Sequence, residues 1–193
     1  RAEESARHEQ TRAARSNMYD KIIAELEQLG TVATGKAWES KGKEVMSLVD
    51  EYTQLDSALP ADEQRQAEWV DTQDKWNAVN KGVGVTPGYD NITAELESCT
   101  NAYELLDQAP DVPQVNALLA SLNTISDQAG ALVTTLGECV STIKTPNAFA
   151  AIEAAAKQTQ ADIDALLEQA RALLGRAEES ARHEQTRAAR SNM

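Results

Sequence analysis

Residues 1–18 read RAEESARHEQTRAARSNM, and residues 176–193 repeat this stretch without a single change. Shared helix-forming composition cannot produce so long an identity, and repetition at a fixed offset is the signature of a tandem-repeat architecture. The chain also starts at Arg1 rather than at an initiator Met and stops in the middle of the pattern. We interpret it as one period of a longer array plus the start of the next period. The alternative is an engineered duplication that joins chains head to tail.

The composition favours helix throughout. Aromatic residues make up 4% of the 193 residues, and there are only five prolines. Ala, Leu, Glu and Gln dominate, and all are good helix formers. No run alternates Val, Ile, Thr and aromatic residues for long enough to build a sheet. We therefore predict an all-α fold, an elongated antiparallel helical bundle with a long continuous helix linking successive repeat units.

Apolar residues recur at three- and four-residue spacing, the pattern of a single helix face. Gly30–Gly35 contains no proline and is predicted to be a kink or loosened turn within one long helix, although a turn that reverses direction is the alternative and would weaken the argument for a rod. Four stronger breaks predict reversals of direction, and an even number of reversals lets an array advance as a rod. These breaks are Pro60, Lys81–Gly88, Pro110 and Thr145–Pro146.

Helix starts are predicted where capping residues or a first-turn proline precede an apolar series. The helix expected after Pro60 carries Trp69, Trp76 and Val83 at seven-residue spacing, which predicts a heptad-like seam in the core. The predicted starts are Pro60 with Asp62 and Glu63, Asp90 or Asn91, Asp111 with Pro113, and Thr145 with Pro146.

Charge separates the duplicated segment from the rest of the chain. Each copy holds four arginines and three glutamates and is therefore +1, which leaves −15 on residues 19–175 out of a total of −13. We predict three parts. Residues 1–18 form an inter-repeat linker helix, residues 19–175 form the helical-bundle body, and residues 176–193 form the linker helix that starts the next repeat.

The chain resembles a known architecture in two features. These are the three tryptophans Trp38, Trp69 and Trp76, and the uninterrupted junction over Leu173–Met193. Helical bundles whose last helix continues into the next bundle resemble the spectrin-type repeats of cytoskeletal rods and the helical repeats of giant bacterial surface proteins. The resemblance implies a structural, non-catalytic unit that acts as a spacer, elastic element or scaffold. It also implies that the partners are neighbouring repeat units, reached through the continuous helix.

No residues are predicted to act in catalysis, cofactor binding or metal binding. His8 and His183 occupy the same repeat position, and neither has the spacing of an HExxH zinc motif. The sequence also lacks a Gly-rich phosphate loop, a CxxC pair and a nucleophile elbow. We expect no enzyme activity and no cofactor.

The strongly acidic chain is expected to repel nucleic acid, and no stretch approaches the ~20 apolar residues of a membrane span. Cys99 and Cys139 fall on apolar helix faces and are expected to be free thiols, which favours a cytoplasmic or cytoskeletal location. An extracellular or cell-surface adhesin stalk is the alternative. A further hypothesis is a binding scaffold that docks a small helical partner in a groove beside Lys81–Gly88.

Overall fold

The computed structural model describes residues 1–32, 35–65, 69–83, 86–142 and 146–192, and within them it is helical almost throughout. A minimal hairpin pairs Gly82 with Pro87 and Val83 with Thr86. The predicted all-α class is confirmed. The elements are α1 (Ala2–Leu29), α2 (Gly35–Ser57), η1 (Ala61–Glu63), α3 (Val70–Lys81), β1 (Gly82–Val83), β2 (Thr86–Pro87), α4 (Tyr89–Gln108), α5 (Val112–Thr142), η3 (Pro146–Phe149) and α6 (Ala150–Ser191).

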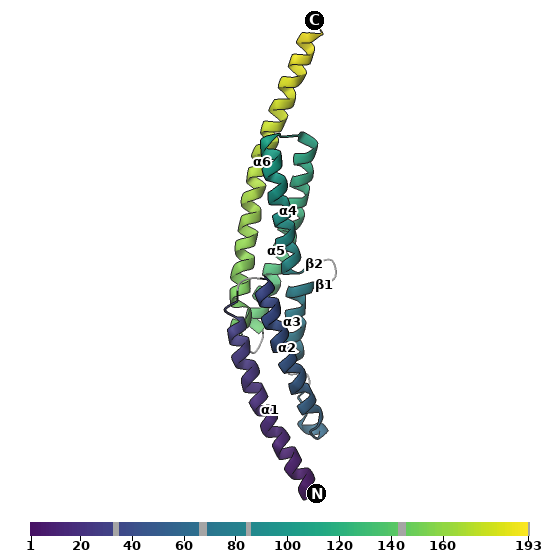
Figure 1. Ribbon diagram of the computed structural model, residues 1–193, viewed down its shortest axis with the longest axis vertical. Coiled ribbons are helices and arrows are strands. Elements are labelled where there is room, and N and C mark those ends of the chain that lie inside the picture. The colour runs from purple at the N-terminus through teal and green to yellow at the C-terminus, as the bar shows by residue number, and fades with distance from the viewer. Residues whose placement is uncertain (33–34, 66–68, 84–85, 143–145, 193) are drawn as a thin grey trace.

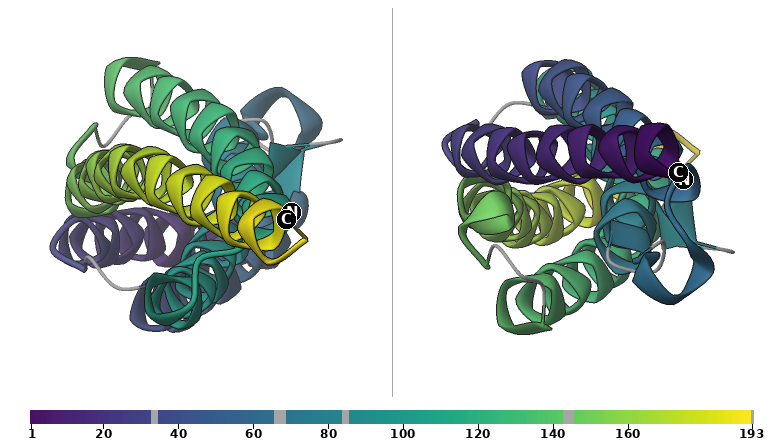
Figure 2. Two further views of the ribbon diagram at one scale, coloured as in Figure 1. Left: turned by 90° about the horizontal axis from the view of Figure 1, so that it is seen from above. Right: turned by 90° about the horizontal axis from the view of Figure 1, so that it is seen from below.

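The helices are arranged in two halves along one long axis. Figure 1 shows α1, α2 and α3 in the half near the N-terminus and α4, α5 and α6 in the other half. The two ends of the chain lie at opposite ends of the molecule (Figure 1), and the end-on views of Figure 2 superimpose the two halves because they follow one another along the axis.

Residues 30–35 join two antiparallel helices, so the predicted kink is wrong. Lys41 of α2 pairs with Glu25 of α1, and Asp56 further along α2 pairs with Arg15, which lies earlier in α1. Residue numbers thus rise along one helix as they fall along the other. The apolar stripe at the end of α1, which includes Ile22, is fully buried because the chain folds back and α2 covers it.

The segment Lys81–Gly88 interrupts the helix, as predicted, but the predicted reversal there is wrong. After the β1–β2 hairpin, α4 continues in the direction of α3 (Figure 1). The predicted caps Asp90 and Asn91 are also wrong, because α4 begins at Tyr89 with Gly88 in extended conformation as its N-cap residue. Between the described helices the direction still reverses four times, since the reversal after α1 replaces the one expected here.

The remaining predicted starts differ in detail. Asp111 caps α5, because its Oδ2 accepts a hydrogen bond from the Gln114 backbone N–H at 3.2 Å. Thr145 lies outside the described residues, and Pro146 opens the 3-10 turn η3 rather than α6 itself.

Pro60 likewise opens a short 3-10 turn, and the long helix of this region starts only at Val70. Trp69 therefore precedes α3, and Val83 lies in β1. The predicted heptad seam is wrong as a continuous helix, although Trp69 and Trp76 are both buried.

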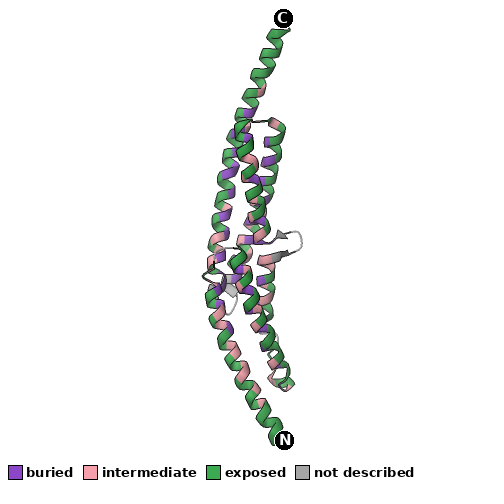
Figure 3. Cartoon of the chain, viewed as in Figure 1, coloured by how far each residue is buried: buried purple, intermediate pink, exposed green. Residues whose placement is uncertain are grey.

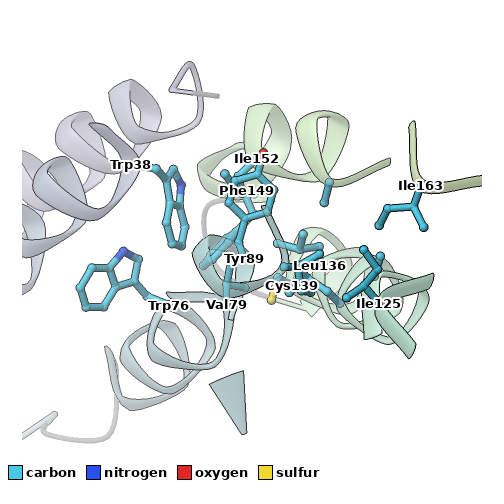
Figure 4. Close-up of a cluster of buried hydrophobic side chains, with 14 of the residues drawn as sticks. Trp38, Trp76, Val79, Tyr89, Ile125, Leu136, Cys139, Phe149, Ile152 and Ile163 are labelled. Atoms are coloured by element: carbon cyan, nitrogen blue, oxygen red, sulfur yellow. The ribbon is translucent and has the colours of Figure 1, made fainter. Parts of the chain in front are cut away.

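A continuous hydrophobic core joins the two halves (Figure 3). Where the halves meet, the ring centroid of Trp38 lies 6.0 Å from that of Trp76 and 5.7 Å from that of Phe149 (Figure 4). The backbone N–H of Ala151, at the start of α6, donates to the Gly30 carbonyl at 3.1 Å. The end of α1 and the start of α6 are therefore fixed to each other.

Gly42→Ala should destabilise the chain by about 1–3 kcal/mol, because a Cβ there would overlap Nε1 of the rigid Trp76 indole. Gly175→Ala is the matched control. Gly175 is an exposed residue inside α6 where an added Cβ would meet nothing within 4 Å, so alanine should add about 1 kcal/mol of helix stability. Urea unfolding of both variants measures the difference, and equal effects of the two substitutions would contradict the tight packing at Gly42.

Candidate functional site

The duplicated segment occupies two different environments in the same molecule. The first copy lies in α1, which passes unbroken from Ala2 to Leu29, and the second lies in α6, which passes unbroken through Gly175 to Ser191. Figure 1 shows that this end of α6 extends beyond the turn between α4 and α5. Identical residues are therefore seen once against the body and once projecting from it.

In the first copy, Arg15 forms a buried ion pair with Asp56 of α2. Arg15 Nη1 lies 2.6 Å from Asp56 Oδ1, and the two side chains are 11% and 0% exposed. Arg15 Nη1 also donates to the Glu63 carbonyl at 3.0 Å, and the Arg65 backbone N–H donates to both Asp56 oxygens at 2.9 Å. Because a carboxylate taken out of water must be paired, this network ties α1 to the end of α2 and to the chain that follows it.

A second arginine of the first copy binds the same region from the surface. Arg12 donates through Nε and Nη2 to the two carboxylate oxygens of Glu63, each at 2.7 Å, in a bidentate pair. The hydrogen bonds from Arg12 hold the pKa of Glu63 below its ordinary value. Arg12 and Arg15, on adjacent turns of one helix, therefore both contact Glu63, through its carboxylate and its carbonyl respectively.

An aromatic cluster begins directly after the first copy. The ring centroid of Tyr19 lies 5.3 Å from that of Trp69 and 6.5 Å from that of Tyr52, and Tyr52 meets Trp69 edge to face at 6.1 Å. Trp69 and Tyr52 are almost fully buried. The ion pairs therefore lie at the open end of a core that begins with the half-buried Met18 and Tyr19.

The second copy contacts the body only through its first residues. Arg176 Nη1 lies 2.6 Å from Asp107 Oδ1 at the end of α4, and Arg176 Nη2 donates to the Asp107 carbonyl at 3.2 Å. Ala177 is 2% exposed and is the last buried residue of α6. Beyond the half-buried Ala181, residues 182–192 are all exposed (Figure 3).

The contacts of the two copies do not overlap. Arg1 and Ala2, which correspond to Arg176 and Ala177, are exposed in the first copy. Arg187 and Arg190, which correspond to Arg12 and Arg15, are exposed in the second, where no hydrogen bond or ion pair of their side chains occurs within the described part of the chain.

None of these ion pairs was predicted from the sequence. The signal for Arg15 is its place seven residues before Ile22 and eleven before Leu26, which puts an arginine on the apolar face of α1. The partners Asp56 and Glu63 carry no such signal, because they lie more than 40 residues away along the chain.

The histidines and cysteines that the sequence singled out lie apart from this contact region or at its edge. His8 is half-buried and His183 is exposed. Cys99 and Cys139 are free, buried thiols, as expected. Burial raises the pKa of Cys139 to about 11, so this thiol stays protonated at neutral pH and packs as a small apolar group.

An open groove of about 420 Å³ lies between α4 and α5, lined by Cys99, Leu106 and Leu118 among others. Leu105 on its rim is 72% exposed. This is a different place from the groove predicted beside Lys81–Gly88, where residues 84–85 and the side chains of 81–87 lie outside what the structure describes. The binding-scaffold hypothesis stays a prediction, because nothing in the described residues identifies an occupant for either place.

Arg15→Ala should lower the free energy of unfolding by about 3 kcal/mol, because it leaves the buried Asp56 carboxylate without its cation. Arg190→Ala makes the same chemical change in the same local sequence, at an exposed position, and should change stability by less than about 0.5 kcal/mol. Urea unfolding of the two variants gives the comparison, and equal losses would show that the Arg15–Asp56 pair contributes nothing.

Acid should weaken the contact between Arg12 and Glu63. Because the folded protein holds the pKa of Glu63 below 4.5, the ionised carboxylate adds stability above pH 4.5, and this contribution is lost as the pH falls through the lower folded value. Glu63→Gln should therefore cost stability at pH 7 and progressively less as the pH falls below 4.5. Thermal unfolding of both proteins from pH 7 to pH 3 measures the difference, and a pH-independent gap would be the contrary result.

Comparison with protein-family models, with curated proteins and with solved structures finds no match to this chain. Within the described ranges, no helix is long and apolar enough to cross a membrane, and no three or more His, Cys, Asp or Glu side chains are grouped closely enough to hold a metal ion. The function must therefore be inferred from the residues and contacts of the chain itself, and the duplicated segment is its most distinctive feature.

Proposed function

We propose that this chain is a structural, non-catalytic repeat unit of a long rod-like or filamentous protein, in which it acts as a spacer, elastic element or scaffold. Each unit is an elongated antiparallel bundle, and a continuous helix links it to the next unit. The observation that carries the proposal is α6, which extends over Ala150–Ser191 and presents a second, exposed copy of a segment that the first copy packs against the body.

The directions of the helices support a linear array. With four reversals between the described helices, α1 and α6 run in the same direction, and their outer ends lie at opposite ends of the molecule (Figure 1). A body placed on the second copy as the present body sits on the first would therefore extend the molecule along its axis. The 42 residues of α6 span about 63 Å, so one helix can serve both units.

In this proposal each half of the body corresponds to one spectrin-type repeat. Each half holds three of the described α-helices, α3 leads to α4 in one direction across the hairpin, and α6 would lead to the next α1. One 175-residue period then comprises two successive three-helix elements. A cytoplasmic or cytoskeletal rod fits the two buried free thiols, and an extracellular stalk is the alternative.

A two-unit chain, residues 1–175 followed by residues 1–193, tests the proposal. Small-angle X-ray scattering should give a maximum dimension nearly twice that of the 193-residue chain. Its thermal unfolding midpoint should be higher, because neighbouring repeats stabilise one another. A two-unit chain with the maximum dimension and midpoint of a single unit would refute the spacer function.

A further inference from the structure

We propose that the duplicated segment is a two-ended clamp, which binds Asp107 of the preceding unit with its first arginine and Asp56 and Glu63 of the following unit with its last two. This inference rests on the proposed repeat function and names the contacts that join the units. The partner of the exposed second copy is thus the α2–η1 region of the next unit in the same polypeptide.

Both ends of the clamp are visible in this chain, one in each copy. The second copy shows the first end bound, with Arg176 on Asp107 and Ala177 buried. The first copy shows the last end bound, with Arg12 on Glu63 and Arg15 on Asp56. Because the 18 residues are identical, the second copy has the same arginines that bind Asp56 and Glu63 in the first copy.

The arginines of the two ends of the clamp lie on the same side of the helix. Arg176 and Arg187 are 11 residues apart, which at ~100° per residue places them about 20° apart around the helix axis. The preceding body and the following body would therefore be bound along one side of the segment, separated along the helix axis rather than around it.

The spacing along the helix also leaves room for two bodies. Arg176, which binds Asp107, and Arg187, which corresponds to Arg12, are 11 residues apart, or about 16 Å of helix. The body that holds Ala177 ends near the turn after α4, and the carboxylates of the next body that bind Arg187 and Arg190 would lie about 16 Å or more further along the helix.

Charge favours this occupant over an unrelated apolar partner. The segment carries +1 and residues 19–175 carry −15, so two bodies placed end to end repel each other unless cations lie between them. The exposed part of the second copy offers alanines and charged or polar side chains, with no large apolar residue in residues 182–192. An arginine pair at helical spacing fits the carboxylates of Asp56 and Glu63, which this same sequence already binds in the first copy.

The test compares the same substitution in two chains. In the 193-residue chain, Arg190→Ala should leave the unfolding equilibrium unchanged within about twofold, because Arg190 is exposed. In the two-unit chain, where this residue meets the second unit's Asp56, it should raise the unfolding equilibrium constant of that unit at least about tenfold. The substitution is tolerated in the single unit, so any loss in the longer chain comes from a contact that only the second body supplies.

Arg182→Ala is the matched control. Neither Arg182 nor its counterpart Arg7 has a side-chain ion pair or hydrogen bond in the described structure, so this arginine belongs to neither end of the clamp, and its loss should have no effect above about twofold in either chain. Equal effects of Arg182→Ala and Arg190→Ala in the two-unit chain would overturn the clamp.

Scattering on the same two-unit proteins separates the two proposals. An extended two-unit chain in which Arg190→Ala has no effect would refute the clamp and leave the spacer function standing. A two-unit chain no longer than one unit would refute the spacer function, and the stability comparison would still decide whether Arg190 contacts the second body.

Discussion

The apolar stripe of α6 ends at Ala177, and the architecture depends on where that stripe ends. A helix in a folded protein gains most of its stability from the face that it buries. In α6 buried residues recur from Ile152 to Ala177, and in α1 they recur only from Ile22 onward. In the proposed array the duplicated segment lies between these two stripes, and it has almost no apolar face of its own. It must therefore be held by helix continuity and by polar contacts.

Helix continuity supplies part of the support for the exposed end of α6. Starting a helix is costly, whereas adding residues to an existing one gains a backbone hydrogen bond for each residue fixed. The buried part of α6 acts as the nucleus, and the Ala-, Glu- and Arg-rich sequence after it has high helix propensity. In α1 the order is inverted, since the buried part follows the segment. The same 18 residues can thus extend a helix from either side.

The parts of the fold that follow from local sequence were predictable. The parts that depend on which helices pack against each other were not. The periodic apolar faces and the Asp111 cap are set by residues a few positions apart. The chain reverses after Gly30 because the apolar stripe around Ile22 packs against α2. No helix breaker stronger than glycine occurs at this reversal. The helix breakers at Lys81–Gly88 predict where the helix is interrupted, but they do not determine the direction of the next helix. A hairpin can be inserted between two helices that continue in the same direction, as β1–β2 is between α3 and α4.

The ion pairs show the same limit and also explain why the segment is basic. An arginine on an apolar face, such as Arg15, indicates that a buried anion must exist somewhere, but only the tertiary fold selects Asp56. Each inter-helix ion pair of the segment in the described structure joins an arginine to a body carboxylate. In the proposed array, a joint that relied on apolar contact would need an exposed hydrophobic patch on every terminal unit, and such patches cause aggregation. Unpaired arginines are well hydrated, so the proposed polar joint could remain unoccupied at the end of an array without promoting aggregation there.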